Sequence, residues 1–389
     1  MTVELGVGIA GLGAATAQTL PAFTTPPKGV RLAGAADLRA EARDDFARRY
    51  RLPAYDSVEK LCTAPDVDVV WVSTPNPLHC EHVLLAAAHG KHVICEKPMA
   101  VTMEQCDRMV EACAEAGVKF IQGHSKIFDS PIRALREVVV SGRLGQVIQI
   151  TSWNYNNWLQ RPRLASEVDT ALGGGLVYRQ GPHHIDIVRY LAGGMAKTVR
   201  GVTGRADPHF DTEGHFSALI TFENGACATL GFNGYGYFDI VELTWNIGEG
   251  GGSVPDPRTR KPKPRVPGSL TAEAKYHWAR TAGPAHDSGE GPRRMPFFGL
   301  TIVACERGHI RQSPDGLFVY TENGCEEIVV RHNAGREAEL VELVAAIEER
   351  RPAFPDAAWG RATLEVCLGI LQSSREGREI TLAKQVPSR

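Results

Sequence analysis

Two glycines follow a short apolar stretch near the start of the chain, in the sequence Gly11-Leu12-Gly13-Ala14. Gly11 would permit a tight turn, and Gly13 would let the backbone approach a pyrophosphate. Ala14 would open a helix whose amino-terminal dipole faces the phosphates. The third glycine of the usual fingerprint is replaced by Thr16. The pattern predicts a dinucleotide-binding loop, with an ordinary glycine-rich turn as the alternative.

An acidic residue, Asp37, ends the next strand that the sequence predicts. A carboxylate at this position accepts hydrogen bonds from the adenosine ribose hydroxyls and repels a 2′-phosphate. We therefore expect NAD as the cofactor. Arg39, two residues later, could neutralise a 2′-phosphate, so the sequence leaves NADP open as a second cofactor.

Two motifs follow later strands of the same half of the chain, Ser73-Thr74-Pro75-Asn76-Pro77-Leu78-His79 and Cys95-Glu96-Lys97-Pro98. Further pieces are Gly173-Gly174-Gly175, Gly181-Pro182-His183 and the closing Ser374-Arg375-Glu376-Gly377. With these motifs the chain resembles, over nearly its whole length, the Gfo/Idh/MocA family of glucose–fructose oxidoreductase and inositol dehydrogenase relatives. The Glu-Lys-Pro tripeptide at a strand end is the most specific of them.

The resemblance implies roles for individual residues. Lys97 matches the lysine that the family places beside the nicotinamide and the reacting hydroxyl, and His183 matches its catalytic histidine. Without the resemblance, Lys97 would be an exposed lysine at a strand end, and His184 would compete with His183. The further cofactor contacts that it implies are Thr74, Pro75 and Asn76 on the nicotinamide side, with His79, and Glu96 at the ribose.

The implied chemistry is the oxidation of a secondary alcohol, in which a base takes the hydroxyl proton while hydride leaves the carbon. Pro182 suits a first helical position, so we expect His183 in the first turn of a helix, where the dipole keeps the ring neutral. Lys97 would stabilise the developing alkoxide on the same oxygen. We expect these side chains, from separate domains, to converge there. His183, His184 and Asp186 lack a further well-spaced ligand, so no metal site is expected.

Several arginines distinguish the second half of the chain. Arg179 stands four residues before His183, where the family's sugar and polyol dehydrogenases usually have an aspartate. Guanidinium groups bind carboxylates in a bidentate manner, and an aromatic side chain suits a flat ring. We therefore expect an anionic, cyclic substrate; the alternative is that the arginines are solvated or paired with Glu167 and Asp169. The expected substrate contacts are Trp158, Arg161, Arg163, Arg179 and His184.

Within the family, the stretch from Arg161-Pro162-Arg163-Leu164 to Arg179-Gln180-Gly181 resembles the phthalate 4,5-cis-dihydrodiol dehydrogenase branch. Members of that branch oxidise a cyclohexadiene cis-diol dicarboxylate to a catechol with NAD(P), in aromatic catabolism. Two alternatives stay open: a dehydrogenase of a sugar, sugar acid or glycoside, and a non-catalytic, cofactor-sensing binding protein of the same fold.

Short apolar strands alternate with helical patterns in the first part of the chain, which predicts a parallel sheet and an α/β fold. We assign residues 1–124 to a dinucleotide-binding Rossmann domain. The predicted strands are Leu5–Ala10, Val30–Ala36, Val67–Ser73, His92–Cys95 and Lys119–Gln122, and the later helices are Glu41–Tyr50, Cys80–His89 and Met103–Ala116.

The alternation of strands and helices ends after residue 124, and strands with short, hairpin-like links follow. We assign residues 125–389 to an α+β domain for substrate binding and oligomerisation, with a large, mostly antiparallel open sheet and a hairpin at Glu223-Asn224-Gly225. Residues 248–298 are expected to form a long loop, and the closing helices 337–350 and 360–375 to return to the Rossmann domain. The predicted strands are Val147–Trp153, Thr198–Ala206, Ser217–Phe222, Ala226–Phe232, Gly316–Thr321 and Glu326–Arg331, with a helix at His183–Leu191.

Composition narrows the function classes. The chain has 389 residues, of which 43% are hydrophobic and 23% charged, as in a folded protein with a sizeable core. A formal net charge of −2 gives no general attraction to nucleic acid or to an anionic membrane. With scattered cysteines, no C-x-x-C pair and no signal peptide or membrane span, we expect a cytoplasmic protein. From the resemblance we expect a homodimer or homotetramer.

Overall fold

The structure is a computed structural model that describes residues 4–123, 125–259, 271–281, 293–332 and 335–389. Two compact units are present, each with its own sheet. The first contains the described residues among 1–125, 275–285 and 336–364, and the second those among 126–274, 286–335 and 365–389. The units are therefore not two consecutive stretches, because the chain returns to the first unit twice.

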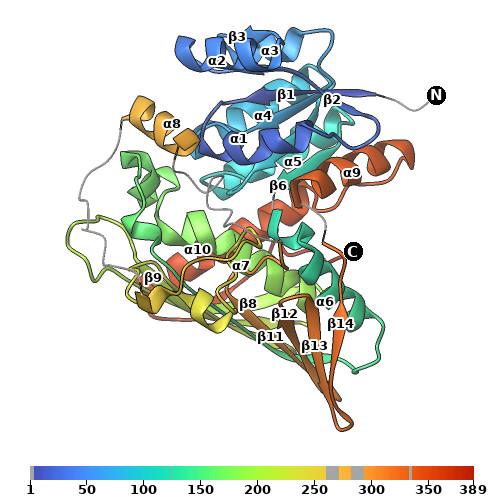
Figure 1. The fold of residues 1–389 in the computed structure, drawn as a ribbon, viewed down its shortest axis with the longest axis vertical. Coiled ribbons are helices and arrows are strands. Elements are labelled where there is room, and N and C mark those ends of the chain that lie inside the picture. The colour runs from blue at the N-terminus through green and yellow to red at the C-terminus, as the bar shows by residue number, and fades with distance from the viewer. Residues whose placement is uncertain (1–3, 124, 260–270, 282–292, 333–334) are drawn as a thin grey trace. The chain divides into compact units, whose positions relative to one another are not determined.

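A six-stranded sheet forms the centre of the first unit, in the order β3-β2-β1-β4-β5-β6, with all neighbours parallel (Figure 1). The strand order reverses at β1 and β4, and in such sheets ligands bind outside the carboxyl ends of the strands at this point. The predicted parallel Rossmann sheet is confirmed. Its strands are Leu5–Ala10 (β1), Val30–Ala36 (β2), Ala54–Tyr55 (β3), Val69–Val72 (β4), His92–Glu96 (β5) and Phe120–Gly123 (β6).

Helices flank this sheet and share its core. β1 and β4 are buried along their whole length, as expected for strands covered on both faces. The core beside them includes Leu340 and Leu343 from a helix near the end of the chain. The helices of this unit are Ala14–Thr19 (α1), Ala40–Tyr50 (α2), Val58–Thr63 (α3), His79–Ala88 (α4), Met103–Glu115 (α5) and Gly335–Glu348 (α9), with most of Ala272–Thr281 (α8) and part of Ala357–Glu376 (α10).

A nine-stranded sheet forms the second unit, in the order β14-β13-β12-β11-β7-β10-β9-β8-β15. Neighbouring strands of this sheet are antiparallel, except for the parallel pair β7 and β10. This confirms the predicted, mostly antiparallel sheet. The strands are Val147–Tyr155 (β7), Ala196–Gly204 (β8), His215–Phe222 (β9), Cys227–Asn233 (β10), Leu300–Cys305 (β11), Gly308–Ser313 (β12), Gly316–Thr321 (β13), Gly324–Val329 (β14) and Ile380–Thr381 (β15).

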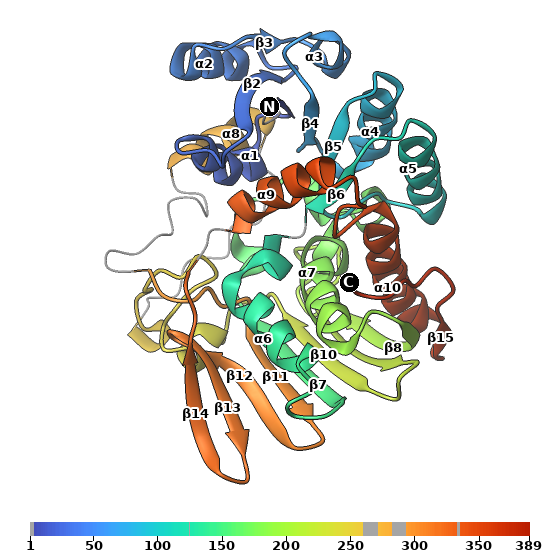
Figure 2. The same cartoon turned by 90° about the vertical axis from the view of Figure 1, so that its right-hand side faces the viewer.

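Two helices, Ser130–Val140 (α6) and Gly175–Ala192 (α7), lie side by side on one face of the nine-stranded sheet (Figure 2). Side chains that alternate with the buried ones point to the opposite face. Trp153, Val202 and Leu219 are exposed there. Exposed apolar side chains on a sheet face can contribute to an interaction surface.

The segment 248–298, which we expected to be a loop, contains a helix, Ala272–Thr281 (α8), among its described residues. Residues 260–270 and 282–292 of this segment lie outside the described residues. The helix escaped sequence reasoning because its aromatic and charged residues form no clear apolar stripe. Within the described ranges, no helix is both long and apolar enough to cross a membrane.

Candidate active site

The glycine loop after β1 has the backbone geometry that its sequence predicts. Gly11 has φ +94°, and a Cβ added there would lie 2.9 Å from the Ser73 carbonyl oxygen. A Cβ on Gly13 would meet no heavy atom within 4 Å, so the space above it is open before Ala14 begins α1. Thr16, in place of the third glycine, is buried and donates its hydroxyl hydrogen bond to the Gly11 carbonyl, which closes the loop.

Asp37 lies at the end of β2 and is held on both carboxylate oxygens. Oδ2 accepts from the Leu12 amide at 2.8 Å and from Arg39 Nη2 at 2.8 Å. Oδ1 accepts from the amide and from Nε of Arg39, each at 2.9 Å. Burial alone would raise the pKa of the Asp37 carboxyl, but the hydrogen bonds from Arg39 and Leu12 outweigh it, and the pKa is lowered. The acid is therefore ionised at neutral pH.

A buried hydroxyl lies beside the glycine loop. Ser73 Oγ follows β4 and has no hydrogen-bond partner in the part of the chain that the structure describes. Its neighbour Thr74 is satisfied, with Oγ1 2.9 Å from His82 Nδ1. Buried polar groups are almost always satisfied, so this hydroxyl indicates a missing partner. The open glycine loop, the ionised acid and this hydroxyl together fit a bound dinucleotide.

His79 connects the two loops that follow β4 and β5. Its Nε2 lies 2.9 Å from the Thr74 carbonyl oxygen and its Nδ1 2.8 Å from the Pro98 carbonyl oxygen. The ring is buried, as is Asn76, whereas Pro75 is exposed. His79 thus acts on the site through the positions of the Thr74 and Pro98 backbones.

Glu96, expected at the cofactor ribose, lies in a buried ion pair in this structure. Its Oε1 pairs with Arg336 of α9 and accepts from Trp71 Nε1 at 3.4 Å. Lys97 follows directly and is half-buried. Arg336 was absent from our sequence-based site, because nothing in a sequence relates residues 240 positions apart. The backbone that presents Lys97 is fixed by this pair.

The triple glycine of the second unit starts α7. A Cβ on Gly174 would lie 2.4 Å from the Ser166 carbonyl oxygen. Gly175 has φ +83°, and a Cβ there would lie 2.5 Å from Glu213 Oε1. That oxygen accepts from the Val177 amide at 2.9 Å and so satisfies one amino-terminal N–H of the helix. Glycine is required at both positions because a neighbouring segment lies against the helix start.

Because α7 starts at Gly175, His183 does not lie where we expected it within the helix. α7 begins at Gly175, so Pro182 lies inside the helix and His183 lies more than two turns from its amino terminus. The expectation that the helix dipole acts on His183 in a first turn is wrong. A proline in a helix interior removes one hydrogen bond and restricts the residue before it, and here that residue is Gly181, which has no side chain to clash.

The two histidines have different surroundings. The His183 ring is 9% exposed and contacts Phe298 edge-on, with centroids 4.9 Å apart. His184 is 0% exposed, and its ring lies 5.5 Å from Phe232 and 5.2 Å from Phe298. Burial lowers the pKa of His184 to about 3. This burial contradicts the expected substrate contact of His184. Lys126, which our sequence-based site omitted, lies with Nζ 5.8 Å from the Phe298 centroid.

Three of the expected substrate residues, Arg161, Arg163 and Arg179, form an arginine cluster whose charges affect one another, with Glu167 nearby. The Arg163 guanidinium lies 4.0 Å above the ring of Trp158. Burial lowers the pKa of Arg163 to about 9, the Glu167 carboxylate opposes this change, and the nearby charges of Arg161 and Arg179 add to it. Trp158 is itself buried, so its ring supports the cation instead of presenting a flat face to substrate.

Glu167 is the acid of this cluster. Its Oε1 accepts from Arg179 Nη2 at 2.8 Å, and its Oε2 accepts from the Leu164 amide at 2.8 Å. Arg161 donates from Nε to Asn157 Oδ1 at 3.2 Å, which is a neutral partner. The pairing of Arg179 with Glu167 agrees with one alternative from the sequence, whereas the other two arginines of the cluster donate hydrogen bonds to neutral partners.

The expected catalytic pair belongs to different units, with Lys97 in the first and His183 in the second. Their convergence on one oxygen therefore stays a prediction. Among the described residues, no group of three or more His, Cys, Asp or Glu side chains could hold a metal ion.

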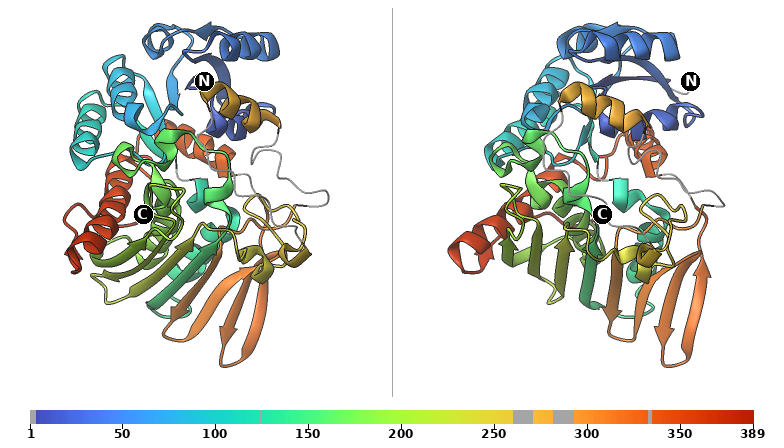
Figure 3. Two further views of the ribbon diagram at one scale, coloured as in Figure 1. Left: turned by 90° about the vertical axis from the view of Figure 1, so that its left-hand side faces the viewer. Right: turned by 60° about the vertical axis from the view of Figure 1, so that its left-hand side comes forward.

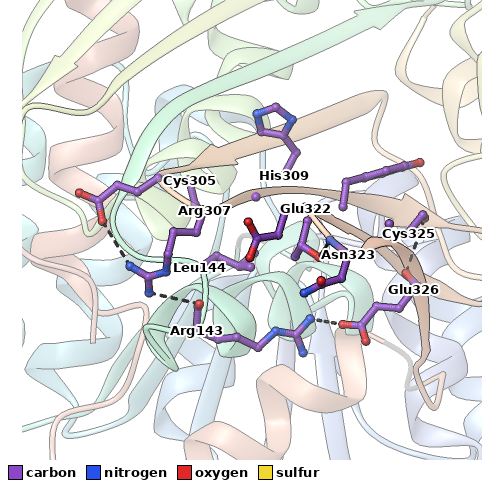
Figure 4. Close-up of a pocket in the computed structure, with 14 residues that line it drawn as sticks. Arg143, Leu144, Cys305, Arg307, His309, Glu322, Asn323, Cys325 and Glu326 are labelled. Atoms are coloured by element: carbon purple, nitrogen blue, oxygen red, sulfur yellow. Dashed lines mark hydrogen bonds and ion pairs between the residues drawn. The ribbon is translucent and has the colours of Figure 1, made fainter.

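A pocket of about 940 Å³ lies elsewhere in the second unit, between the hairpins β11–β12 and β13–β14 (Figure 4). Arg143 pairs with Glu326 across it, and Arg307 donates to the Gly142 carbonyl at 2.9 Å. None of the expected site residues lines this pocket, and we place no part of the reaction there.

Comparison with known proteins agrees with the fold and the cofactor loop. Residues 5–124 match the oxidoreductase family with an NAD-binding Rossmann fold, and residues 132–240 match the GFO/IDH/MocA C-terminal domain. A Comamonas testosteroni protein, 1-carboxy-3-chloro-3,4-dihydroxycyclohexa-1,5-diene dehydrogenase, is 36% identical over 378 residues, which are 95% of this chain and 94% of the relative.

Solved structures of other proteins have the same fold. A crystal structure from Bordetella bronchiseptica RB50 has a TM-score of 0.89 at 34% identity and covers 97% of this chain and 100% of that one. An Agrobacterium radiobacter oxidoreductase in complex with NAD+, L-tartaric acid and magnesium has a TM-score of 0.74 at 17% identity, covers 97% of this chain and 98% of that one, and shows the shared fold.

Fold and cofactor site therefore define a nicotinamide-dependent oxidoreductase that acts on hydroxyl donors, with NAD as its cofactor. The chain belongs to the Gfo/Idh/MocA family.

Proposed function

We propose that this enzyme oxidises a hydroxyl group on a cyclic, carboxylated substrate, specifically a cyclohexadiene cis-dihydrodiol such as that of phthalate. The observation that carries the proposal is the arginine cluster. Arg179 pairs with Glu167, and Arg163, whose pKa is lowered by burial, lies close enough to Arg161, Arg179 and Glu167 to be affected by the charges of all three. Partly buried positive charge in excess is unfavourable unless an anion compensates it. A substrate carboxylate supplies that charge.

The name of the Comamonas testosteroni relative supports the same substrate class, since it describes a ring that bears one carboxyl group and two hydroxyl groups. A neutral sugar would bring no negative charge to the arginine cluster. The substrate of the present enzyme has at least one carboxylate, and the number of guanidinium groups also suits a dicarboxylate.

The proposed reaction breaks one C–H and one O–H bond of the diol. His183 accepts the hydroxyl proton, and Lys97 donates a hydrogen bond to the oxygen as it gains negative charge. Bound NAD supplies the hydride acceptor. The carbonyl product then tautomerises to a catechol: a proton leaves the remaining carbinol carbon and a proton is added to the carbonyl oxygen, and this aromatisation makes the oxidation favourable. The arginine cluster holds the carboxylate so that the reacting carbon is oriented.

A substrate panel tests the proposal. Initial rates of NADH formation are measured with a carboxylated cis-dihydrodiol, the same ring without a carboxyl group, inositol and a sugar acid. We expect the carboxylated diol to have the highest kcat/KM, at least about 100-fold above the neutral ring, because losing one buried charge-assisted contact costs about 3 kcal/mol. Turnover of the sugar acid alone would replace this proposal with a sugar-acid dehydrogenase.

The catalytic roles need a separate test. Lys97→Met and His183→Asn should each lower kcat by about 100-fold or more, since positioned proton transfer contributes roughly that much. NADH affinity, measured by fluorescence titration, should stay close to that of the unmodified enzyme. Near-normal turnover in both variants would overturn these two assignments, whereas no turnover of any panel substrate by the unmodified protein would favour a binding protein of the same fold.

We also propose that the enzyme is a homodimer or homotetramer that pairs through the face of the nine-stranded sheet opposite α6 and α7. Trp153 and Leu219 are exposed on that face. Trp153→Glu combined with Leu219→Lys should produce monomers in light-scattering mass measurements. An unchanged mass would place the interface elsewhere.

A further inference from the structure

Most of helix α8 belongs to the first unit, although α8 is far in sequence from the other elements of that unit. Tyr276 of α8 is 3% exposed and belongs to the same apolar core as Leu12 and Phe46. Its hydroxyl donates to Asp45 Oδ2 of α2 at 3.1 Å. In Figures 1 and 3, α8, drawn in orange, lies beside the blue elements of this unit. Tyr276 is therefore the anchor of α8.

Arg39 lies over the ring of Tyr276. The Arg39 guanidinium carbon lies 4.6 Å from the centre of the Tyr276 ring, within the range of a cation–π contact. Nη2 of the same group also donates to the Leu12 carbonyl at 3.2 Å. Arg39 is thus held by α8, by the glycine loop and by Asp37 together.

The contacts on Asp37 leave little room for another donor. A carboxylate has about four acceptor positions. The Leu12 amide takes one, the Arg39 amide takes another, and the Arg39 side chain takes two in a bidentate pair. The two ribose hydroxyls of an adenosine would need positions of the same carboxylate, and a bidentate guanidinium has the same pair of donors side by side.

We propose that Arg39, backed by Tyr276, is a built-in competitor of the adenosine ribose for Asp37. Binding of the dinucleotide requires the guanidinium to leave the carboxylate, and the Tyr276 ring determines how strongly it is retained. This inference rests on NAD binding, which the family establishes, and is independent of the proposed substrate. It identifies α8 as an element that sets the affinity of the enzyme for its cofactor.

The test is a fluorescence titration of the purified full-length enzyme with NADH, read as a dissociation constant. We expect Arg39→Met to lower the Kd for NADH by at least about threefold, because the competitor is removed. Arg43→Met is the matched control: Arg43 lies in the first turns of α2, which Arg39 precedes, and donates at 2.9 Å to the Asp37 backbone carbonyl, not to its carboxylate. Its Kd should stay within twofold of the unmodified enzyme.

Two variants at Tyr276 separate the ring from the hydroxyl. Tyr276→Phe keeps the ring beneath Arg39 and should leave the Kd for NADH unchanged. Tyr276→Leu removes the cation–π contact, and its Kd should fall between those of the unmodified enzyme and Arg39→Met. If Tyr276→Leu fails to fold, as judged by thermal unfolding, Arg39→Met decides alone. An unchanged or weakened NADH affinity in Arg39→Met would overturn the proposal.

Discussion

The guanidinium carbon of Arg163 lies 4.0 Å from the centre of the Trp158 ring, and its Nη2 donates to the Trp158 carbonyl at 2.7 Å. One residue therefore fixes the cation both through its ring and through its backbone. With a pKa lowered to about 9, Arg163 is still protonated at neutral pH. The result is a rigid positive charge in a half-buried position, which suits a site that must orient a carboxylate.

Replacement of Arg163 by methionine should impair binding of the anionic substrate. We expect KM to rise about 30-fold or more, since loss of one partner of a buried, hydrogen-bonded charge pair costs at least about 2 kcal/mol. The NADH dissociation constant should be unchanged. Arg205→Met is the control, because Arg205 is exposed and pairs with Asp211 at 3.0 Å.

The lowered pKa of Arg163 predicts that KM for the anionic substrate depends on pH. Above about pH 9, Arg163 loses its proton, so KM of the unmodified enzyme should rise there. Arg163→Met should lack this rise. A KM that rises equally in both enzymes would assign the effect to another group.

Arg179→Gln should have a smaller effect on the substrate. Arg179 is already paired with Glu167 at 2.8 Å, so only part of its charge is available to a ligand. We expect KM for the carboxylated diol to rise about three- to tenfold, which corresponds to roughly 1 kcal/mol. Arg179→Asp is a poorer test, because it places a second carboxylate beside Glu167. A parallel loss of NADH affinity would indicate general misfolding of the variant.

His184 should make the enzyme less stable in acid. Burial lowers its pKa to about 3 in the folded protein, from an ordinary value of 6.5. Between these values the unfolded chain binds a proton that the folded protein does not, so stability is present above pH 6.5 and falls as the pH decreases. Urea unfolding should show a loss of about 2 kcal/mol from this group between about pH 7.5 and about pH 5.

His184→Leu removes this titration while keeping a buried apolar side chain. The variant should lose about 2 kcal/mol less than the unmodified enzyme over the same pH interval. Equal losses in the two proteins would show that His184 is accessible to protons in the folded state.

The sequence predicts the buried strands of this fold well. β1 at Leu5–Ala10 and β2 at Val30–Ala36 have the predicted bounds, because their apolar runs end at glycine or charged residues. Helix α7 was misplaced, since Pro182 is a strong local signal for a helix start, whereas the real start depends on Glu213 from a distant segment. Local patterns cannot reveal a helix end that another segment stabilises.

In the candidate site, too, the features that follow from local sequence were predictable, and those that depend on distant segments were not. The glycine loop and Asp37 are contiguous with their strands, so their positions follow from the sequence. The burial of His184 and the pair between Glu96 and Arg336 depend on tertiary packing that spacing does not encode. Tyr276 carries no motif and is found only through its contact with Arg39.

The most direct test of the account is the fate of the carbinol hydrogen. A carboxylated cis-dihydrodiol deuterated at both carbinol carbons is oxidised with NAD, and the NADH and the ring product are analysed by NMR and mass spectrometry. We predict one deuterium at C4 of the nicotinamide and a catechol carboxylate in equal amount. Unlabelled NADH, or no turnover of this diol while a neutral sugar is oxidised, would contradict the proposed reaction.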